Sequence, residues 1–219
     1  ESSAAEIAED ATGTFDGVYS SAPAPRAFSQ RGSVFRDVNR AIDFGGGTMQ
    51  LADPGDNVEF HSGGTAWTVE AWCKLNNVDH AQWMVAKDDR RNGQGSLDYL
   101  LGADADGHFV FRTQGEAHIA RAPIAAVIDG ETWHYVVGVQ DPDAGKVSLF
   151  VDGLEVVSVD LTTTGITVED GPLTLGSPSL IKPEQFVDGL LDEVAIYNVA
   201  LPPDQILAHY FAGSLCPAE

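Results

Sequence analysis

Residues 186–211 read FVDGLLDEVAIYNVALPPDQILAHYF, in which a strand-like run carries the acids Asp192 and Glu193 and is followed by two prolines and a short apolar segment. Proline is favoured in the first turn of a helix, so this order predicts a closing strand and then a short helix over residues 203–211. The same stretch places two acids where a metal ion could bind.

The segment WTVEAWCKL, residues 67–75, alternates with a period of two between apolar and more polar positions. Trp67 and Cys73 share the apolar face, and this period predicts a strand with one buried face. Trp72 falls on the opposite face, which indicates that the second side of the strand is partly covered or is a platform for a ligand.

Asp-Gly pairs separate several strand-like runs. LDYLLGAD and HFVFRTQ meet at Asp106-Gly107, and KVSLFV and LEVVSV meet at Asp152-Gly153. Both pairs supply the positive φ angles that tight hairpin turns require. Many short strands without alternating helices predict an all-β fold, namely a two-sheet antiparallel jelly-roll sandwich with one short C-terminal helix.

The chain has 219 residues, of which 43% are hydrophobic, and this is enough for one substantial core. We therefore expect a single domain over residues 1–219. Residues 1–40 mix Gly, Ser, Pro and Arg with isolated aromatics, and we expect an irregular segment that wraps the edge of the sandwich. Residues 41–200 are expected to supply the strands.

Acidic residues dominate the composition, since 33 Asp and Glu against 12 Lys and Arg give a formal net charge of -21. Such a surface repels nucleic acid and anionic lipid and attracts divalent cations. No run of about 18 apolar residues suggests membrane insertion, and the first residues are acidic where a signal peptide would be basic. We expect an extracellular or cell-surface protein whose signal sequence is not present in this chain.

Two cysteines, Cys73 and Cys216, are too few for a disulfide-stapled scaffold of this length. Cys73 lies on the apolar side of its alternation, which favours a buried free thiol. A bridge to Cys216 stays open as the alternative.

Motifs of hydrolytic or nucleotide-binding sites, such as HExxH, GxSxG and a phosphate-binding glycine loop, do not occur in the sequence. Glycoside hydrolysis needs two carboxyl groups about 5–10 Å apart across the substrate. Asp192 and Glu193 are consecutive on a strand and point to opposite faces, and Glu70 has no acid two residues away on its own face. We therefore expect a protein that is not an enzyme, with a polysaccharide hydrolase or lyase as the less favoured reading.

Carbohydrate-binding modules of sandwich folds combine an aromatic ring with amide, acid or arginine groups that bind hydroxyls. Five residues on polar strand faces or in loops are candidates for such a site: Trp72, Trp83, Tyr99, His108 and Arg112. For each aromatic residue a place in the core is an equally good reading. Trp67 and Trp133 are expected to be core residues because of their alternation.

Seven short segments follow one another in the order DATGTFDGVY, AIDFGG, WTVEAWCKL, ETWHYVVGV, KVSLFVDG, PLTLG and FVDGLLDEVAIYNVALPPDQI. Together they resemble the laminin-G-like jelly-roll family of the concanavalin A-like lectin/glucanase superfamily. The resemblance covers nearly the whole chain, and the order of the segments makes it specific.

The resemblance implies one structural calcium ion near the sheet edge where the N- and C-terminal segments meet. Carried over to this sequence, the side-chain ligands are Asp10 and Asp192, with Glu1 or Glu193 as a further acid, and backbone carbonyls near Thr12 and Asp16-Gly17 complete the set. Calcium takes about six to eight oxygen ligands, including carbonyls of irregular loops. In the alternative reading Asp10 caps a loop and Asp192 is an ordinary acid of an edge strand.

These expectations favour a non-catalytic, calcium-stabilised, lectin-like carbohydrate-binding module of a secreted or cell-surface protein. The alternative is an adhesion or spacer domain that binds protein partners, because laminin-G-like domains do both and a fold alone does not decide function. The expected partner is thus a glycan or a cell-surface or matrix protein, and the module is expected to be part of a larger multidomain chain.

Overall fold

The fold was analysed in a computed structural model of the chain. The structure describes residues 7–8, 11, 17–19, 25, 27–33, 40–51, 65–88, 97–113, 118–162, 172–177 and 183–214.

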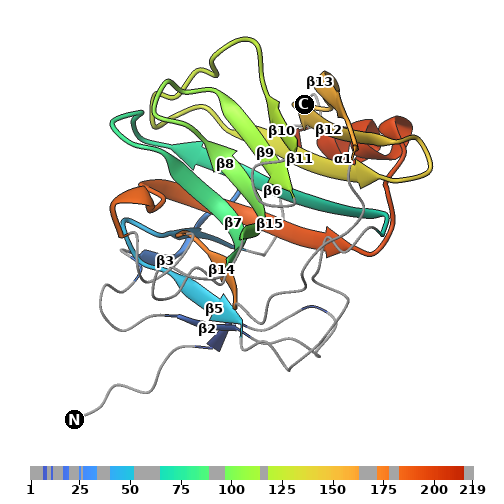
Figure 1. The fold of residues 1–219 in the computed structure, drawn as a ribbon. Helices are drawn as coiled ribbons and strands as arrows, with labels where there is room; N and C mark the ends of the chain where they lie inside the picture. The colour runs from blue at the N-terminus through green and yellow to red at the C-terminus, as the bar shows by residue number, and fades with distance from the viewer. Residues whose placement is uncertain are drawn as a thin grey trace.

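Two antiparallel sheets face each other and form a jelly-roll sandwich, which confirms the predicted fold class (Figure 1). The eight-stranded sheet has the order β1 (Ile7–Ala8), β2 (Gly17–Tyr19), β5 (Met49–Leu51), β14 (Leu173–Leu175), β7 (Gln82–Asp88), β8 (Leu97–Ala103), β9 (Phe109–Thr113) and β10 (His118–Arg121). The seven-stranded sheet has the order β13 (Leu154–Asp160), β12 (Lys146–Val151), β11 (His134–Asp141), β6 (Trp67–Leu75), β15 (Gly189–Tyr197), β4 (Arg40–Asp43) and β3 (Ala27–Arg31).

The predicted C-terminal helix is present as α1 (Pro203–Ser214), and a short 3-10 helix, η3 (Pro183–Gln185), precedes β15. Among the residues that the structure describes, no helix combines the length and apolar character that crossing a bilayer requires. Residues 1–40 differ from expectation, because they are not only an irregular wrapping segment. They contribute β1, β2 and β3 to the two sheets.

Both predicted hairpins form. β8 pairs with β9 around the Asp106-Gly107 turn, where Gly107 has a φ of 80°. β12 pairs with β13 around Asp152-Gly153, where both residues have positive φ angles, 52° and 81°. The Asp-Gly signals therefore identified turns whose backbone conformation favours glycine.

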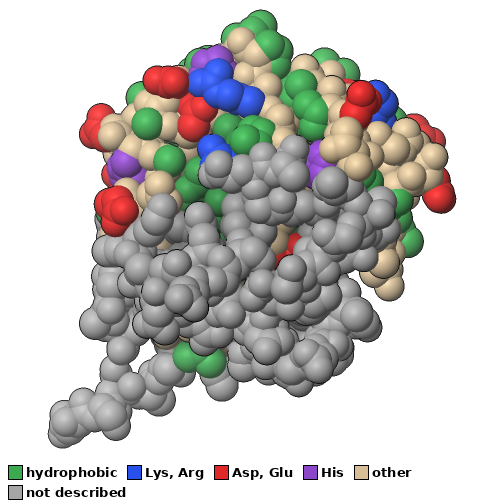
Figure 2. All heavy atoms as spheres, viewed as in Figure 1, with side chains coloured by type: hydrophobic (Ala, Val, Ile, Leu, Met, Phe, Trp, Pro, Cys, Tyr) green, Lys and Arg blue, Asp and Glu red, His purple; other side chains and the backbone are tan. Residues whose placement is uncertain are grey.

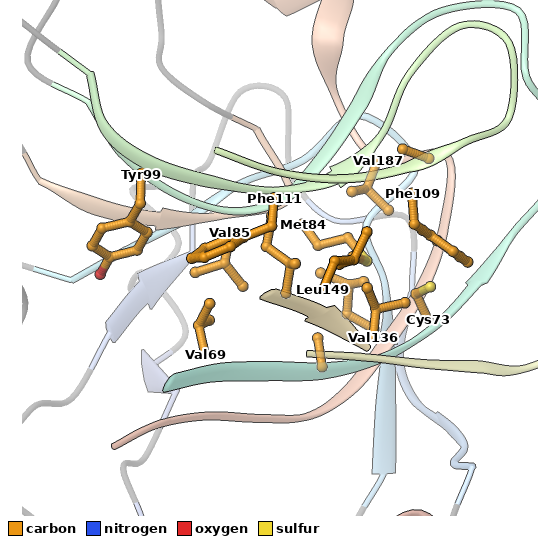
Figure 3. Close-up of a cluster of buried hydrophobic side chains, with 14 of the residues drawn as sticks. Val69, Cys73, Met84, Val85, Tyr99, Phe109, Phe111, Val136, Leu149 and Val187 are labelled. Atoms are coloured by element: carbon orange, nitrogen blue, oxygen red, sulfur yellow. The ribbon is translucent and has the colours of Figure 1, made fainter. Parts of the chain in front are cut away.

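The main core fills the space between the sheets. In Figure 3, Met84, Val85 and Phe111 of the eight-stranded sheet point toward Val69 and Leu149 of the seven-stranded sheet. Cys73 lies in the same core as a free thiol with no exposed surface, and burial raises the pKa of this thiol above its ordinary value. A thiol that stays protonated is a poor nucleophile, so Cys73 acts as a small apolar residue.

A second apolar cluster covers the outer face of the seven-stranded sheet. It is built from Trp72, Tyr135 and neighbouring side chains together with Ile206 of α1. Trp72 stacks on Tyr210 of α1 with ring centroids 5.8 Å apart, and only 5% of Trp72 is exposed. Of the two readings that the sequence left open for the second side of β6, a covered face or a ligand platform, the structure shows the covered face, which α1 buries.

Candidate functional site on the outer face of the eight-stranded sheet

Two of the predicted ligand-binding residues meet on the outer face of the eight-stranded sheet. Arg112 of β9 places its guanidinium over the indole ring of Trp83 of β7, with 5.2 Å between the guanidinium carbon and the ring centroid. Both side chains belong to the face that points away from the main core, since Trp83 packs with Leu100 and Val110 in a separate cluster. β8 lies between the two strands.

The local sequence explains why these side chains point outward. β9 alternates, so Phe109 and Phe111 enter the core while Val110 and Arg112 face out. On β7, an irregularity in the pairing between Trp83 and Val85 places two consecutive residues on the core side and leaves Trp83 outside. Such a bulge re-aims a side chain in a way that regular alternation does not.

Gly102 of β8 makes room for the indole ring of Trp83. A Cβ atom at Gly102 would collide with the backbone carbonyl oxygen of Gln82 and would lie 2.8 Å from a ring carbon of Trp83. The indole N–H donates to Oε1 of Gln185 in η3 at 3.2 Å. Only 3% of Trp83 is exposed, so its ring is a fixed support for Arg112 rather than an open platform.

β10 adds an apolar side chain and a second arginine to this face. Ile119 pairs directly with Arg112 and is 38% exposed, and Arg121 pairs with Val110. Figure 2 shows basic, acidic and hydrophobic side chains side by side over the part of the molecule that holds β8, β9 and β10. We call Trp83, Arg112, Ile119 and Arg121 the β7–β10 surface.

Arg121 is held in place by two acids of the β8–β9 turn. Its Nε lies 2.6 Å from Oδ2 of Asp104, and its Nη2 lies 3.2 Å from Oδ2 of Asp106. Partial burial alone would raise the pKa of Asp104, but the hydrogen bonds from Arg121 and from two backbone N–H groups outweigh it and hold the pKa below its ordinary value. Asp104 therefore stays ionised and keeps Arg121 oriented.

The three other predicted ligand-binding residues lie elsewhere. Trp72 is buried beneath α1, and Tyr99 has no exposed surface because it faces the main core, where its ring lies 4.4 Å from that of Trp67. His108 is the last residue before β9, and its Nδ1 lies 2.7 Å from the carbonyl oxygen of Ala122. Trp72 and Tyr99 are therefore core residues, which was one of the two readings that the sequence allowed for each.

Sequence reasoning missed Ile119 and Arg121. The signal was present in HIAR, because His118 and Ala120 are buried while Ile119 and Arg121 are exposed. A four-residue alternation is too short to stand out from the sequence alone.

Of the predicted metal ligands, Asp192, Glu193 and Gly17 lie within the described residues; Glu1, Asp10, Thr12 and Asp16 lie outside them. The described part of the chain contains no group of three or more His, Cys, Asp or Glu side chains arranged to hold a metal ion.

Asp192 is 6% exposed and ties β15 to a segment far away in the sequence. Its Oδ2 accepts hydrogen bonds from the backbone N–H of Ser33 at 2.7 Å and from the Ser33 hydroxyl at 3.1 Å. Its Oδ1 accepts the backbone N–H of Glu193 at 3.0 Å, and Glu193 has a φ of 46° within a break in the β15–β6 pairing. Oδ1 keeps a lone pair for a further partner, so a cation beside this oxygen is compatible with the hydrogen bonds of Asp192.

Solved structures of other proteins share this fold. Domain 4 of the extracellular arabinanase AbnA from Geobacillus stearothermophilus, solved in complex with arabinotriose, matches with 17% identity and a TM-score of 0.64 over 93% of this chain and 98% of that one. Trypanosoma rangeli sialidase matches with 16% identity and a TM-score of 0.68 over 95% of this chain, which spans 31% of the sialidase chain. The binding domain of botulinum neurotoxin DC, solved with rat synaptotagmin II, matches with 12% identity and a TM-score of 0.55 over 95% of this chain and 45% of that one.

At these identities the structural matches establish the fold and nothing finer. A comparison with curated protein sequences gave no significant match. A family model, Laminin_G_3, described as the concanavalin A-like lectin/glucanases superfamily, matches residues 44–207. This superfamily includes both enzymes and proteins that are not enzymes. Because the match covers more than half of the chain and agrees with the sandwich described above, the chain belongs to the concanavalin A-like lectin/glucanases superfamily.

Proposed function

We propose that the chain is a non-catalytic carbohydrate-binding module and that the β7–β10 surface is its binding site. The observation that carries this proposal is the pair of Arg112 and Trp83, which presents an oriented guanidinium beside the exposed apolar side chain of Ile119. Oriented hydrogen-bond donors next to an apolar surface suit a sugar, which has hydroxyl groups and apolar C–H faces. The complex of the arabinanase domain with arabinotriose agrees with this role for the fold.

Each residue of the surface has a distinct part in the proposed site. Trp83 holds the guanidinium plane by a cation–π contact, which reduces the conformational freedom that Arg112 would lose on binding. Arg112 donates hydrogen bonds to sugar hydroxyls, and Ile119 contacts the apolar face of the ring. Arg121 extends the row of donors, and its salt bridges with Asp104 and Asp106 fix its position.

The acids of this surface do not suit glycoside hydrolysis. A hydrolase needs one carboxyl group that can give a proton and a second that acts as a base or nucleophile. The lowered pKa of Asp104 keeps this acid ionised, and Asp106 pairs with the same guanidinium. A binding role therefore fits Asp104 and Asp106, the two acids that contact this surface through Arg121, better than catalysis.

Replacing Arg112 with alanine is expected to weaken glycan binding by about tenfold or more, as loss of one buried or stacked charged hydrogen-bond donor does. Arg112→Lys is expected to lose most of this affinity too, because lysine keeps the charge but not the planar fork. The measurement is a glycan array followed by calorimetry on the saccharide that binds. Lys146→Ala, which removes a charge from β12 of the other sheet, is the matched control.

If the Arg112→Ala variant binds glycan with unchanged affinity, the binding site lies outside the β7–β10 surface. No binding across a broad array of neutral and acidic saccharides would instead support the alternative, an adhesion or spacer domain. Release of reducing sugar or unsaturated products from any polysaccharide would contradict the non-catalytic role.

We also propose that a calcium ion at Asp192 stabilises the module and that the module works outside the cell, where calcium is abundant enough to fill weak sites. Support comes from the position of Asp192, which already joins β15 to Ser33 across 159 residues. Oδ1 of Asp192 accepts one hydrogen bond from the protein and has capacity for the ion.

Calcium is expected to raise the melting temperature of the wild-type protein, and Asp192→Ala is expected to abolish this rise. In EDTA, Asp192→Ala is still expected to be less stable than wild type by about 1–3 kcal/mol, because Ser33 loses its acceptor. Calorimetric melts with calcium and with EDTA separate the two effects. A wild-type melting temperature that does not respond to calcium would exclude the ion and leave the hydrogen bonds as the whole role of Asp192.

A further inference from the structure

Three connecting segments meet at one end of the sandwich. They are the β6–β7 turn (residues 76–81), the β8–β9 turn (residues 104–108) and the segment between β10 and β11 (residues 122–133). The backbone N–H of Ala126 donates to the carbonyl oxygen of Gly107 at 2.8 Å, which fastens the third segment to the second. A Cβ atom at Gly107 would lie 3.2 Å from Val78, so the first segment contacts the second.

Large apolar side chains are exposed on this end. Ile124 is 80% exposed, Val127 is 60% exposed and Val78 is 39% exposed. The position of a Cβ atom at Gly107 is within 4 Å of both Val78 and Ala125, which places the segments of these residues beside each other. We call Val78, Ile124 and Val127 the apolar end surface. Neighbouring exposed hydrophobic residues of this kind are a feature of docking sites.

The backbone that carries this surface is fixed, although it has no regular secondary structure. His134 of β11 contacts the carbonyl oxygen of Val127 through Nε2 at 3.0 Å and Oδ2 of Asp152 through Nδ1 at 2.9 Å. The backbone N–H of Gly130 donates to the carbonyl oxygen of Leu75 at 2.9 Å. Ile128 packs against the main core. Ile124 and Val127 are thus held in position before any partner arrives, which lowers the entropy lost on binding.

Acids surround the apolar end surface. Asp79, Asp129 and Glu131 are exposed, and 82% of the Asp106 side chain is exposed. The sequences of the three segments, NNVDHA, DADGH and APIAAVIDGETW, contain no Lys or Arg. Arg121, which contacts the β8–β9 turn, is already paired with Asp104 and Asp106. Lys74 of β6 lies over the ring of Trp133 at the end of the third segment, 5.4 Å from its centroid, and places a further cation against these segments. Asp79, Asp106, Asp129 and Glu131 outnumber it, so the apolar side chains of this end lie within a mainly acidic surround.

We propose that the apolar end surface docks a polypeptide segment in which a large apolar side chain is flanked by Lys or Arg. Charge complementarity selects this occupant, because the acidic surround attracts a basic segment and steers its approach. A second copy of the chain would bring the same acids face to face at a formal net charge of -21 each. Anionic lipid and nucleic acid are repelled by the same charge.

The docked segment would adjoin the β7–β10 surface at Arg121, whose partner Asp106 belongs to the acidic surround. Ile124 and Val127 belong to the connection between β10 and β11, whereas Arg112 and Trp83 lie on the face of the sheet. The apolar contacts of the two proposed ligands thus involve different residues, and neither proposal depends on the other.

The test is selection of a phage-displayed peptide library on the wild-type chain, with counter-selection on the double variant Ile124→Ser, Val127→Ser. We expect enrichment of peptides with an apolar residue beside Lys or Arg. The affinity of synthetic copies is expected to fall about tenfold or more in the double variant. It is also expected to fall when salt is raised from about 50 mM to about 500 mM. Leu154→Ser is the matched control, since Leu154 is 65% exposed on β13 and its loss should leave binding unchanged.

Several results would overturn the proposal. Selected peptides that are acidic, or that bind the double variant as well as the wild type, exclude this occupant, as does a selection that enriches nothing. Dimers of the wild type in sedimentation that disappear in the double variant would identify a second copy as the occupant. Binding to phosphatidylserine vesicles that depends on Ile124 and Val127 would identify a lipid surface. Thermal melts of the double variant and of Leu154→Ser check that both proteins are folded. We expect melting temperatures close to that of the wild type, because the substituted side chains are exposed.

Discussion

Glu70→Ala is expected to lower the free energy of unfolding by about 3 kcal/mol and the melting temperature by about 6–12 °C. Glu70 is 7% exposed on the outer face of β6 and accepts hydrogen bonds from two tyrosines. The Tyr135 hydroxyl lies 2.5 Å from its Oε2, and the Tyr197 hydroxyl lies 2.9 Å from its Oε1. Alanine would leave the Tyr135 hydroxyl without its acceptor in a buried place and the Tyr197 hydroxyl without its acceptor in a partly buried one, and this loss is larger than that of an ordinary exposed hydrogen bond.

The pKa values of the two tyrosines support their role as donors. Burial, and after it the negative charge of Glu70, raises the pKa of Tyr135 and of Tyr197 above the ordinary value. Both hydroxyl groups therefore keep their protons over the whole range in which the protein is handled. His209 of α1 places Nδ1 3.1 Å from Oε2 of Glu70, so the same carboxylate also fastens the helix to the sheet.

Glu70→Gln and Glu155→Ala are the controls. Glutamine has the same shape and can accept from one tyrosine and donate to the other, so it is expected to lose only about 1 kcal/mol. Glu155 is exposed on β13, and its removal is expected to change stability by less than about 0.5 kcal/mol. Urea denaturation gives the free energies, and near-ultraviolet circular dichroism reports the Trp72–Tyr210 stack. A Glu70→Ala variant as stable as the Glu155→Ala variant would show that the hydrogen bonds of Glu70 contribute nothing to the free energy of unfolding.

The surroundings of Glu70 and Trp72 show what local patterns in the sequence predict and what they do not. Alternation placed Glu70 and Trp72 correctly on the same face of β6, opposite to Cys73. It did not show that α1, more than 130 residues later, covers that face and turns Trp72 into a core residue. The two tyrosine partners of Glu70 come from β11 and β15, and such pairing depends on strand order, which a period of two does not contain.

The same limit applies to the β7–β10 surface. Side-chain type and position on polar strand faces or in loops were enough to select Trp83 and Arg112, and the structure brings these two together. The orientation of Trp83 depends on the irregular pairing after it on β7, which regular alternation misses. Hairpin turns were predicted well because Asp-Gly is a local signal. The hydrogen bonds between Asp192 and Ser33 were not predicted, because they link residues 159 positions apart.

Gly138→Val is expected to have an effect at least as large as that of Glu70→Ala, with a loss of about 3 kcal/mol or more. Gly138 pairs with Val69 on one side and with Leu149 on the other, in the middle of the seven-stranded sheet. The ring of Phe111 from the opposite sheet occupies the place where a Cβ atom at Gly138 would lie. Any side chain here forces the two sheets apart or drives Phe111, which has no exposed surface, out of its packing.

A double-mutant cycle separates this steric cause from a change in the backbone. Gly138→Ala combined with Phe111→Leu is expected to be more stable than the sum of the single losses predicts, because the smaller leucine makes room for the new methyl group. Gly145→Ala is the control for a change in the backbone. This glycine has a φ of 64° and no atom within 4 Å of its Cβ position. Alanine there is expected to lower the free energy of unfolding by only about 1–2 kcal/mol, through conformational strain. Additive losses in the cycle, measured by urea denaturation, would mean that Phe111 is not what excludes a side chain at Gly138. Because the ring and the missing Cβ atom belong to different sheets, a positive cycle would also identify this contact as one that sets the spacing of the sandwich on which both proposed binding surfaces are built.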